Sequence, residues 1–340
     1  MKQIWIPRHG APDVLELRET TDPEPGKGQL RITVHFSGIN FADILARMGL
    51  YPDSPKIPCV VGYEVSGIVE AIGEGVDTRW LGVRVAALTR FEGYSSKVCV
   101  PKDQIMIVPD GISLESAAAL PVNYLTAYIM MVKQAAFSDG DTLLIHGIGG
   151  GVGIAALQLA KIIRAKIIIG TASSWKHDAL RKMGADHLID YNHEDFVEST
   201  LEITNGKGVD LVLDPVGGKN VKRSYECLRP LGNMVLFGIS SAAPGKRRNL
   251  FAGLSALLST SKFHPIRLIN DNKGVIGCNL GHLWSERERL GEAMVQLVTW
   301  LGDGKIAPEV DKVFSFEEAS EAHSYIQDHR NLGKVLLTPL

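Results

Sequence analysis

The order of hydrophobic and polar positions divides the chain into two patterns. Up to about residue 121 it shows short alternating runs such as LRITVHF, EVSGIVEAI and RVAALT, broken by Gly and Pro. These runs predict a mainly β domain with tight turns. From Asp141 apolar strands alternate with helical runs, which is typical of a doubly wound parallel sheet. Parallel strands are predicted at Thr142–His146, Lys166–Gly170, His187–Asp190, Val209–Asp214 and Asn233–Gly238, with a sixth at Gly274–Leu280.

The last part of the chain leaves this alternation. An amphipathic helix is predicted at Glu286–Leu301, and Ser315 with Glu318 forms a capping box ahead of a final helix. The chain closes with a strand, KVLLTP. The segment Ser240–Lys273 is longer than a usual connection, so we interpret it as a lid, a partner-facing loop or a substrate wall.

A glycine cluster follows the first parallel strand. Gly147, Gly150 and Gly153 fit the spacing G-x-x-G-x-x-G, whereas G-x-G-x-x-G fails because Val152 stands at its last position. Glycines allow a sharp turn and close approach to a pyrophosphate, and the following helix offers free N–H groups to that anion. A glycine triplet alone fits any flexible turn, but its place between a strand and the helix IAALQLAKII predicts a dinucleotide site.

Composition narrows the classes of function. The 340 residues are 45% hydrophobic and 22% charged with a net charge of −2, so there is no electrostatic case for nucleic acid or an anionic membrane. The four cysteines are scattered without a C-x-x-C pair, which predicts neither a zinc lobe nor a disulfide framework and suits a cytoplasmic protein. The start MKQIWIPRHG lacks a signal-peptide core, and no apolar run reaches membrane-spanning length.

Nearly the whole chain resembles a known family through seven segments: GINFADILARMGLYP, GYEVSGIVEAIGEGV, ALPVNYLTAY, GIGGGVGIAALQLAK, GADHLIDY, GVDLVLDPVGG and NLGKVLL. It is similar to the medium-chain dehydrogenase/reductase superfamily, in its zinc-free quinone oxidoreductase branch, and within it to vesicle amine transport protein-like members. The resemblance implies an α/β fold. It places a GroES-like, mainly β catalytic domain at residues 1–122, a Rossmann NADPH-binding domain at 123–283, and a return to the catalytic domain at 284–340.

Zinc is the first test of this resemblance. The alcohol dehydrogenases of the superfamily carry a catalytic Cys where this chain has Asn40, and a His in a G-H-E motif that here reads Gly62-Tyr63-Glu64. A catalytic zinc needs three protein ligands and an open position. We therefore expect no metal and a structural role for Glu64, although an alcohol dehydrogenase with another metal arrangement stays an alternative.

Cofactor choice is the second test. The second parallel strand ends Gly170-Thr171-Ala172-Ser173-Ser174, with no carboxylate to hold the 2′-hydroxyl of NAD. In the family, the positions matching Ser173, Lys176 and Tyr191 cradle the 2′-phosphate of NADPH. The alternatives are a solvated Lys176 in the first turn of a helix and a packing role for Tyr191. The missing acid favours NADPH.

The resemblance assigns further cofactor contacts along the strand ends. Asn40 and Thr126 would contact the nicotinamide ribose and carboxamide, while Gly150, Gly151 and Val152 would bind the pyrophosphate through their N–H groups. The other implied positions are Thr171, Val216, Phe237, Gly238, Asn279, Leu280 and Asn331. Asn331 could also be a turn residue, and Phe237 and Leu280 could be core residues.

The implied reaction is hydride transfer from NADPH to a quinone or an α,β-unsaturated carbonyl compound, such as an enone or alkenal. The candidate catalytic residues are Tyr51, Asn40 and Tyr63, because a tyrosine with a pKa of about 10 can donate a proton at neutral pH. Water is another donor, Tyr51 could simply pack in the cleft wall, and Tyr63 could fill the volume of the missing His.

Two expectations concern partners. GVIGCNL would be an edge strand that pairs with its copy in a homodimer. The segment 246–264 is basic at KRR and then apolar, which leaves a second class of function open. This second class would be a nucleotide-binding protein with little turnover that contacts lipid or vesicles. We prefer the interpretation that the segment is a loop covering the substrate cleft.

Overall fold

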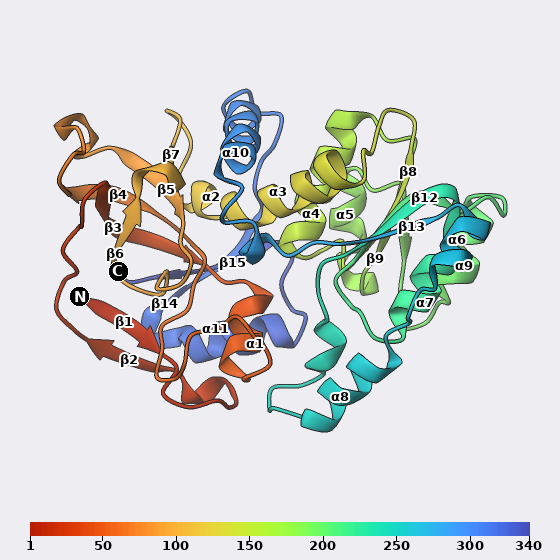
Figure 1. The fold of residues 1–340 in the computed structure, drawn as a ribbon, viewed down its shortest axis with the longest axis horizontal. Helices are drawn as coiled ribbons and strands as arrows, with labels where there is room; N and C mark the ends of the chain where they lie inside the picture. Colours follow the sequence, from red (N-terminus) through yellow and green to blue (C-terminus); the bar gives the residue numbers. More distant parts are fainter. The chain divides into compact units, whose positions relative to one another are not determined.

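The computed structural model describes the backbone of residues 1–340 and all side chains except those of Leu250 and Ala252. The chain forms two compact units, and Figure 1 labels most of their helices and strands. Unit 1 comprises Met1–Leu125, Gly245–Arg248 and Gly281–Leu340, and unit 2 comprises Thr126–Pro244 and Asn249–Leu280. The short return of Gly245–Arg248 to unit 1 has no counterpart in the sequence pattern.

Unit 1 is built on a seven-stranded sheet in the order β14-β15-β3-β4-β5-β7, with β6 also paired to β3. All its pairs are antiparallel except β14 with β15. Buried and less buried residues alternate along most of β3, as the sequence pattern predicted. The strands are β3 (Gln29–Gly38), β4 (Glu64–Ile72), β5 (Arg84–Leu88), β6 (Lys97–Pro101), β7 (Ile105–Ile107), β14 (Val310–Ser315) and β15 (Lys334–Thr338); β1 (Lys2–Trp5) and β2 (Glu16–Glu19) form a separate antiparallel pair.

The helices of unit 1 carry two capping boxes. Asn40 and Asp43 cap the start of α1, and Ser315 with Glu318 caps the turn before α11, as predicted. Helix α2 packs against β3, β4 and β5. The helices are α1 (Phe41–Arg47), α2 (Leu114–Ala118), α10 (Arg287–Gly302) and α11 (Ala319–Gln327), while α3 (Pro121–Tyr128) runs from unit 1 into unit 2.

Unit 2 is a six-stranded, fully parallel sheet in the order β10-β9-β8-β11-β12-β13. The order reverses direction at β8, so unit 2 is the predicted doubly wound sheet. Its strands are β8 (Thr142–His146), β9 (Ile167–Thr171), β10 (His187–Ile189), β11 (Val209–Asp214), β12 (Leu228–Leu236) and β13 (Gly274–Gly277). Its helices are α4 (Gly151–Ile163), α5 (His177–Met183), α6 (Phe196–Ile203), α7 (Asn220–Glu226), α8 (Leu250–Ser259) and α9 (Pro265–Asp271), with a π-helical piece at Ile129–Gln134.

The predicted elements differ from the observed ones mainly at their ends. Strand β12 starts at Leu228, five residues before the predicted start at Asn233, because Leu228 already pairs with Val209 ahead of a bulge. Strand β13 ends at Gly277 rather than Leu280. The long segment after β12 is not one loop, because it contains helices α8 and α9.

Candidate active site

The glycine turn of unit 2 joins strand β8 to helix α4. All five residues of β8 are buried, and Gly147 then turns the chain with a φ of +64°, which favours glycine. Gly150 is the N-cap of α4, and within the described part of the chain no side chain caps this first turn. The first amides of the 13-residue helix are therefore open to an anion.

Gly153 determines how closely α4 packs on this turn. A Cβ at Gly153 would lie 2.5 Å from the carbonyl oxygen of Gly147 and 2.6 Å from Cα of Ile148. Both are backbone atoms, so a side chain could enter only if the turn shifted. The three glycines of the motif thus do different things: Gly147 turns the chain, Gly150 caps the helix, and Gly153 allows close packing.

The end of β9 brings together side chains that lie far apart in sequence. The Ser173 Oγ and Tyr191 Oη atoms are 3.0 Å apart and hydrogen-bond each other on the surface of unit 2. Lys176 lies one turn further on and is only 7% exposed, with its Nζ atom 5.0 Å from the ring centroid of Trp175. Lys176 is therefore not the solvated helix residue of the alternative interpretation.

Asp190, the acidic residue next to Tyr191 in sequence, accepts hydrogen bonds from neighbouring amide groups. Asp190 accepts hydrogen bonds from the Asn192 backbone N at 3.0 Å and from its Nδ2 at 2.9 Å. It also accepts one from the Ser174 N at 3.3 Å. These bonds, the Asn192 backbone bond foremost, hold the pKa of Asp190 below its usual value. The carboxylate shapes the two loops that carry Ser173 and Tyr191.

His146, at the end of β8, belongs to a buried chain of hydrogen bonds that sequence reasoning missed. Its Nδ1 atom lies 3.2 Å from Thr171 Oγ1, and its Nε2 atom lies 3.0 Å from Ser224 Oγ. Ser224 donates its proton to Asp214 Oδ2 at 2.7 Å, so it accepts from Nε2–H of the histidine. The Nδ1 atom then accepts from Thr171. Burial lowers the pKa of His146, which agrees with a neutral ring.

This chain of bonds reaches the glycine turn. The backbone N of Gly147 donates to Thr171 Oγ1 at 3.3 Å. Thr171, one of the predicted cofactor positions, is buried and uses its hydroxyl to connect His146 with the turn. The network therefore fixes the backbone that precedes the open amides of α4.

Asp214 arranges the loop after β11. Its Oδ1 atom accepts from the backbone N of Val216 at 2.7 Å and of Gly217 at 3.1 Å. Next to this loop lies a cavity of about 360 Å³ within unit 2. Val216 is the one predicted cofactor position among its lining residues, which are Val216, Gly217, Gly218, Lys219, Asn220, Arg223, Ser241, Ser255, Ala256 and Ser259.

The remaining predicted positions of unit 2 follow the strand ends or lie in a helix. Phe237 and Gly238 come directly after β12, and Asn279 and Leu280 come after β13. Thr126 is buried in α3. The carboxyl ends of parallel strands are where doubly wound sheets bind their ligands, so four of these five positions lie on the expected edge.

Asn40, Glu64 and Lys334 form a buried polar group in unit 1. The ammonium of Lys334 pairs with Glu64 Oε1 and also donates to Asn40 Oδ1 at 2.7 Å. The Nδ2 atom of Asn40 donates to Glu64 Oε1 at 3.0 Å. Glu64 Oε2 accepts from the backbone N of Val122 at 2.7 Å, which agrees with the structural role expected for this glutamate. Both polar ends of the Asn40 amide are thereby held in one orientation.

Asp43, in the first turn of α1, supports the same region. It is completely buried and accepts hydrogen bonds from the backbone N of Asn40 at 2.8 Å and of Gly62 at 2.9 Å. Burial raises the pKa of Asp43 to about 7, although these two bonds and the Lys334 charge act in the opposite direction. Asp43 thus ties the start of α1 to the Gly62-Tyr63-Glu64 segment.

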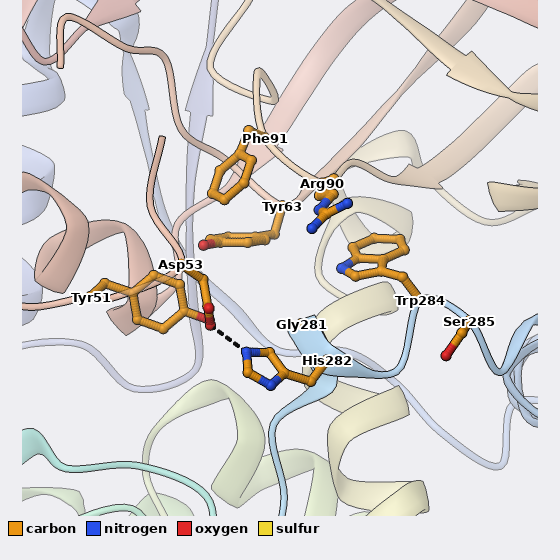
Figure 2. Close-up of a pocket in the computed structure, with 9 residues that line it drawn as sticks. All are labelled: Tyr51, Asp53, Tyr63, Arg90, Phe91, Gly281, His282, Trp284 and Ser285. Carbon is orange, nitrogen blue, oxygen red and sulfur yellow. Dashed lines mark hydrogen bonds and ion pairs between the residues drawn. The ribbon is translucent and has the colours of Figure 1, made fainter. Parts of the chain in front are cut away.

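Tyr51 and Tyr63 line one cavity of about 330 Å³ in unit 1, shown in Figure 2. Their ring centroids are 6.4 Å apart at 85°, and Tyr63 is 5.4 Å from Phe91. Asn40 is not among the lining residues. The full lining consists of Tyr51, Asp53, Tyr63, Arg90, Phe91, Gly281, His282, Trp284 and Ser285. The structure brings two of the three candidate catalytic residues together and keeps the third in the lysine–glutamate group.

The hydroxyl of Tyr63 is the notable polar atom of this cavity. It is buried and has no hydrogen-bond partner among the described residues. Burial raises the pKa of Tyr63 well above its usual value, and Asp43 and Tyr51 add to this effect. Tyr63 is therefore a neutral phenol that can donate a hydrogen bond at any physiological pH.

Comparison with known proteins gives the family. The alcohol dehydrogenase GroES-like domain family matches residues 26–112, and the zinc-binding dehydrogenase family matches residues 183–337. The synaptic vesicle membrane protein VAT-1 homolog of Mus musculus is 38% identical over 325 residues, covering 96% of this chain and 80% of that protein. The chain belongs to the medium-chain dehydrogenase/reductase family. Within this family it is similar to both the VAT-1 homologs and the quinone oxidoreductases.

The quinone oxidoreductases match over the full length. The quinone oxidoreductase of Pseudomonas aeruginosa is 32% identical over 340 residues, covering 99% of both chains. The crystal structure of Escherichia coli quinone oxidoreductase complexed with NADPH superposes with a TM-score of 0.88 at 33% identity, covering 100% of both chains. The predicted GroES-like and Rossmann architecture is thus confirmed.

Two features are not found among the described residues. Within them, no helix combines the length and apolar character needed to cross a bilayer. In the same part of the chain, no three His, Cys, Asp or Glu side chains are grouped so that they could hold a metal ion.

Several residues of the candidate site were missed by sequence reasoning. Arg90, Phe91 and Trp284 line the cavity of unit 1, yet each comes from a loop without a recognisable motif. His282 also lines this cavity and lies outside the seven segments that carry the family resemblance. The partner of Glu64 was also missed, although Lys334 lies in the closing segment NLGKVLL. Asn331 donates to the carbonyl oxygen of Gly333 at 2.9 Å, within its own turn.

Proposed function

We propose that this protein is an NADPH-dependent, zinc-independent reductase that transfers hydride to a quinone or to an α,β-unsaturated carbonyl compound. The observation that carries the proposal is the arrangement of unit 2. Open amides follow Gly150, and the Ser173–Tyr191 pair with Lys176 stands at the end of the next strand. The first suits a pyrophosphate and the second a 2′-phosphate. The NADPH complex of the Escherichia coli relative supports the same cofactor.

Each proposed contact follows from the position of a residue. NADPH, when bound, supplies the hydride. The N–H groups of Gly150, Gly151 and Val152 bind the pyrophosphate, and Ser173 and Tyr191 donate hydroxyl hydrogen bonds to the 2′-phosphate, whose charge Lys176 offsets. The other proposed cofactor contacts are Asn40, Thr126, Thr171, Val216, Phe237, Gly238, Asn279, Leu280 and Asn331.

The proposed proton chemistry belongs to the cavity of unit 1. Tyr63 is protonated before the reaction. Its hydroxyl donates a hydrogen bond to the oxygen of a carbonyl group, on which negative charge develops as hydride arrives, and it is the proposed source of the proton for that oxygen. Tyr51 lies next to it and is the alternative donor. The amide of Asn40 is held at both ends, so we propose that it positions a ligand and does not transfer a proton.

The Lys334 ammonium supports a mechanism without zinc. It lies in contact with Asn40, which stands where zinc-dependent relatives carry their Cys, and with Glu64, which follows the position of their His. A divalent cation placed there would meet this buried positive charge at close range. The rival, an alcohol dehydrogenase with another metal arrangement, is tested by metal analysis of the purified protein, where stoichiometric zinc would overturn the proposal.

The test of function is a screen of NADPH oxidation over quinones, enones and alkenals, with NADH in parallel. We expect turnover of at least one acceptor class and preference for NADPH. Equal use of NADH would contradict the roles of Ser173 and Lys176, and failure to bind either nucleotide would contradict the whole proposal. We also propose a cytoplasmic location, which fractionation of expressing cells tests; its support is the four free cysteines.

We propose a homodimer formed through β13. This strand is one edge of the six-stranded sheet, and its exposed edge could continue the sheet into a second copy. Light scattering after gel filtration should give twice the mass of the chain. A monomer at micromolar concentration would contradict this assembly.

A second candidate function is contact with a lipid surface, and helix α8 favours it. Phe251, Leu254, Leu257 and Leu258 on this helix are each more than half exposed, and Lys246, Arg247 and Arg248 precede it in sequence. Similarity to synaptic vesicle membrane proteins points the same way. Co-sedimentation with anionic vesicles tests this function. Leu257→Ser with Leu258→Ser should abolish binding, whereas Ile269→Ser on α9 should not, and equal loss in both would contradict it.

A further inference from the structure

The cavity of unit 1 combines aromatic walls with an arginine that has no ion-pair partner among the described residues. Tyr51, Tyr63, Phe91 and Trp284 supply the aromatic side chains, and Asp53, Arg90 and His282 supply the charged or ionisable ones. A volume of about 330 Å³ lies at the lower end of the range for small-molecule sites, roughly 300–1,000 Å³. Such a space suits a compact, planar molecule whose faces contact aromatic rings.

The charged groups of the cavity are not equivalent. Asp53 Oδ2 lies 2.7 Å from His282 Nε2, so this carboxylate already accepts a hydrogen bond from the imidazole N–H. Among the described residues, Arg90 has no ion-pair or hydrogen-bond partner. Arg90 and Trp284 both line the cavity, and in the view of Figure 2 the Arg90 guanidinium is separated from the Asp53–His282 pair. The cavity therefore carries an unpaired cation on one side.

The second polar feature is the Tyr63 hydroxyl, which is buried and has no partner among the described residues. Because a buried donor without an acceptor is costly, its presence at a cavity wall points to a ligand oxygen. In Figure 2 this hydroxyl points toward Tyr51, whereas Arg90 lies at the opposite end of the Tyr63 ring. A ligand that satisfies both groups needs a carbonyl oxygen at one end and an anion at the other.

We infer that the cavity takes a planar conjugated carbonyl compound bearing an anionic group, with Tyr63 donating to the carbonyl oxygen and Arg90 binding the carboxylate or sulfonate. Guanidinium groups bind such anions through two parallel hydrogen bonds and also stack on aromatic faces. This inference rests on the proposed reductase function and names the substrate class of that site. Arg90 is then the residue that sets specificity, and Tyr63 serves any acceptor.

The test compares two acceptors that differ only in charge. p-Carboxybenzalacetone and its methyl ester share the same enone, and a naphthoquinone-sulfonate with its parent quinone forms a second pair. We expect the wild type to prefer the anionic member of each pair in kcat/KM. Arg90→Gln should lower kcat/KM for the acid about tenfold more than for the ester, which corresponds to about 1.4 kcal/mol. Arg90→Lys should retain part of the preference.

Controls separate this inference from the proposed function. Arg79→Gln removes an exposed arginine that is paired with Asp77 outside the cavity, and it should leave the acid-to-ester ratio unchanged. Tyr63→Phe should lower kcat/KM for both acceptors alike. If Arg90→Gln leaves the ratio unchanged while the ester is reduced, the inference is overturned and the reductase stands. If no acceptor oxidises NADPH, the proposed function fails. Binding of the acid is then measured by calorimetric titration of the wild type and of Arg90→Gln. Equal affinity in the two proteins overturns the inference.

Discussion

The ammonium of Lys334 and the carboxylate of Glu64 form an ion pair inside unit 1, where the side chains are 3% and 0% exposed. One end of this pair lies on β15 and the other at the start of β4. Removing one partner of a buried pair leaves an uncompensated charge, which costs far more than the pair itself contributes. The pair also orients Asn40, so its loss affects both stability and the candidate site.

Substitution of Lys334 tests this relationship. We expect Lys334→Met to lower the free energy of unfolding by about 3–5 kcal/mol, because Glu64 would remain buried without its partner. The double variant Lys334→Met with Glu64→Gln should lose less than the sum of the two single variants. Urea denaturation measures all three. Lys305→Met, at an exposed pair with Asp303, should change stability by less than about 0.5 kcal/mol, and an equal loss there would contradict the argument.

The glycine turn gives a prediction with a matched control. Gly153→Ala places a Cβ 2.5 Å from the Gly147 carbonyl oxygen, so it should destabilise the protein by about 1–3 kcal/mol and weaken NADPH binding. Gly291 lies in helix α10, where an added Cβ would meet no atom within 4 Å outside its own helix turn. Gly291→Ala should therefore stabilise by roughly 0.5–1 kcal/mol and leave NADPH binding unchanged. Thermal unfolding measures the stability of both variants, and nucleotide titration measures their NADPH binding. If Gly153→Ala changed neither, α4 would not pack on the turn as described.

Nucleotide preference should follow the charge at the end of β9. Ser173→Asp places a carboxylate beside Tyr191, where it would repel a 2′-phosphate and could accept from a 2′-hydroxyl. We expect kcat/KM for NADPH to fall roughly tenfold or more, about 1.4 kcal/mol, relative to that for NADH. Lys176→Gln should act in the same direction, whereas Lys182→Gln on the exposed side of α5 should not. An unchanged ratio in Ser173→Asp would remove the 2′-phosphate site from this position.

Asp43 should give the protein a measurable pH dependence of stability. Its pKa of about 7 in the folded state exceeds the value of about 4 expected for an unfolded chain. Between these values the folded state binds more protons, so the stability that Asp43 contributes falls as the pH rises from about 4 to 7. The difference in unfolding free energy between wild type and Asp43→Asn should decrease over that window and level off above it. A difference that is flat with pH would mean that Asp43 stays ionised.

Much of the fold follows from local patterns. The strands of unit 2 are apolar runs because the middle of a parallel sheet is covered on both faces, and each predicted run overlaps an observed strand, with ends that differ by up to five residues. The capping box at Ser315 and the C-terminal glycine of α5 at Gly184, with a φ of +107°, follow from single residues in the same way. These features can be predicted because the residues that cause them lie within a few positions of the element that they shape.

The candidate site is harder to predict from the sequence, because its residues come from segments that lie far apart in the chain. Ser173 and Tyr191 could be paired only by family resemblance, and their hydrogen bond forms because β9 and β10 are neighbours in the sheet. Nothing near Arg90 in sequence indicates that it shares a cavity with Tyr63 and Trp284. No motif marks His146, yet it lies at the end of β8 and hydrogen-bonds Thr171 at the end of β9 and, through Ser224, reaches Asp214 at the end of β11.

The sequence by itself determined the two kinds of domain, the order of the strands along the chain and the glycine turn. The spacing of hydrophobic residues and the backbone freedom of glycine act between residues a few positions apart, so both can be recognised in the sequence. Only the tertiary structure decided that Lys334 meets Glu64 across 270 positions, that Tyr63 keeps a buried hydroxyl without a partner among the described residues, and that Arg90 is left unpaired among them. Burial and charge pairing depend on which distant segments fold together, and a charged residue looks the same in sequence whether water or another side chain surrounds it.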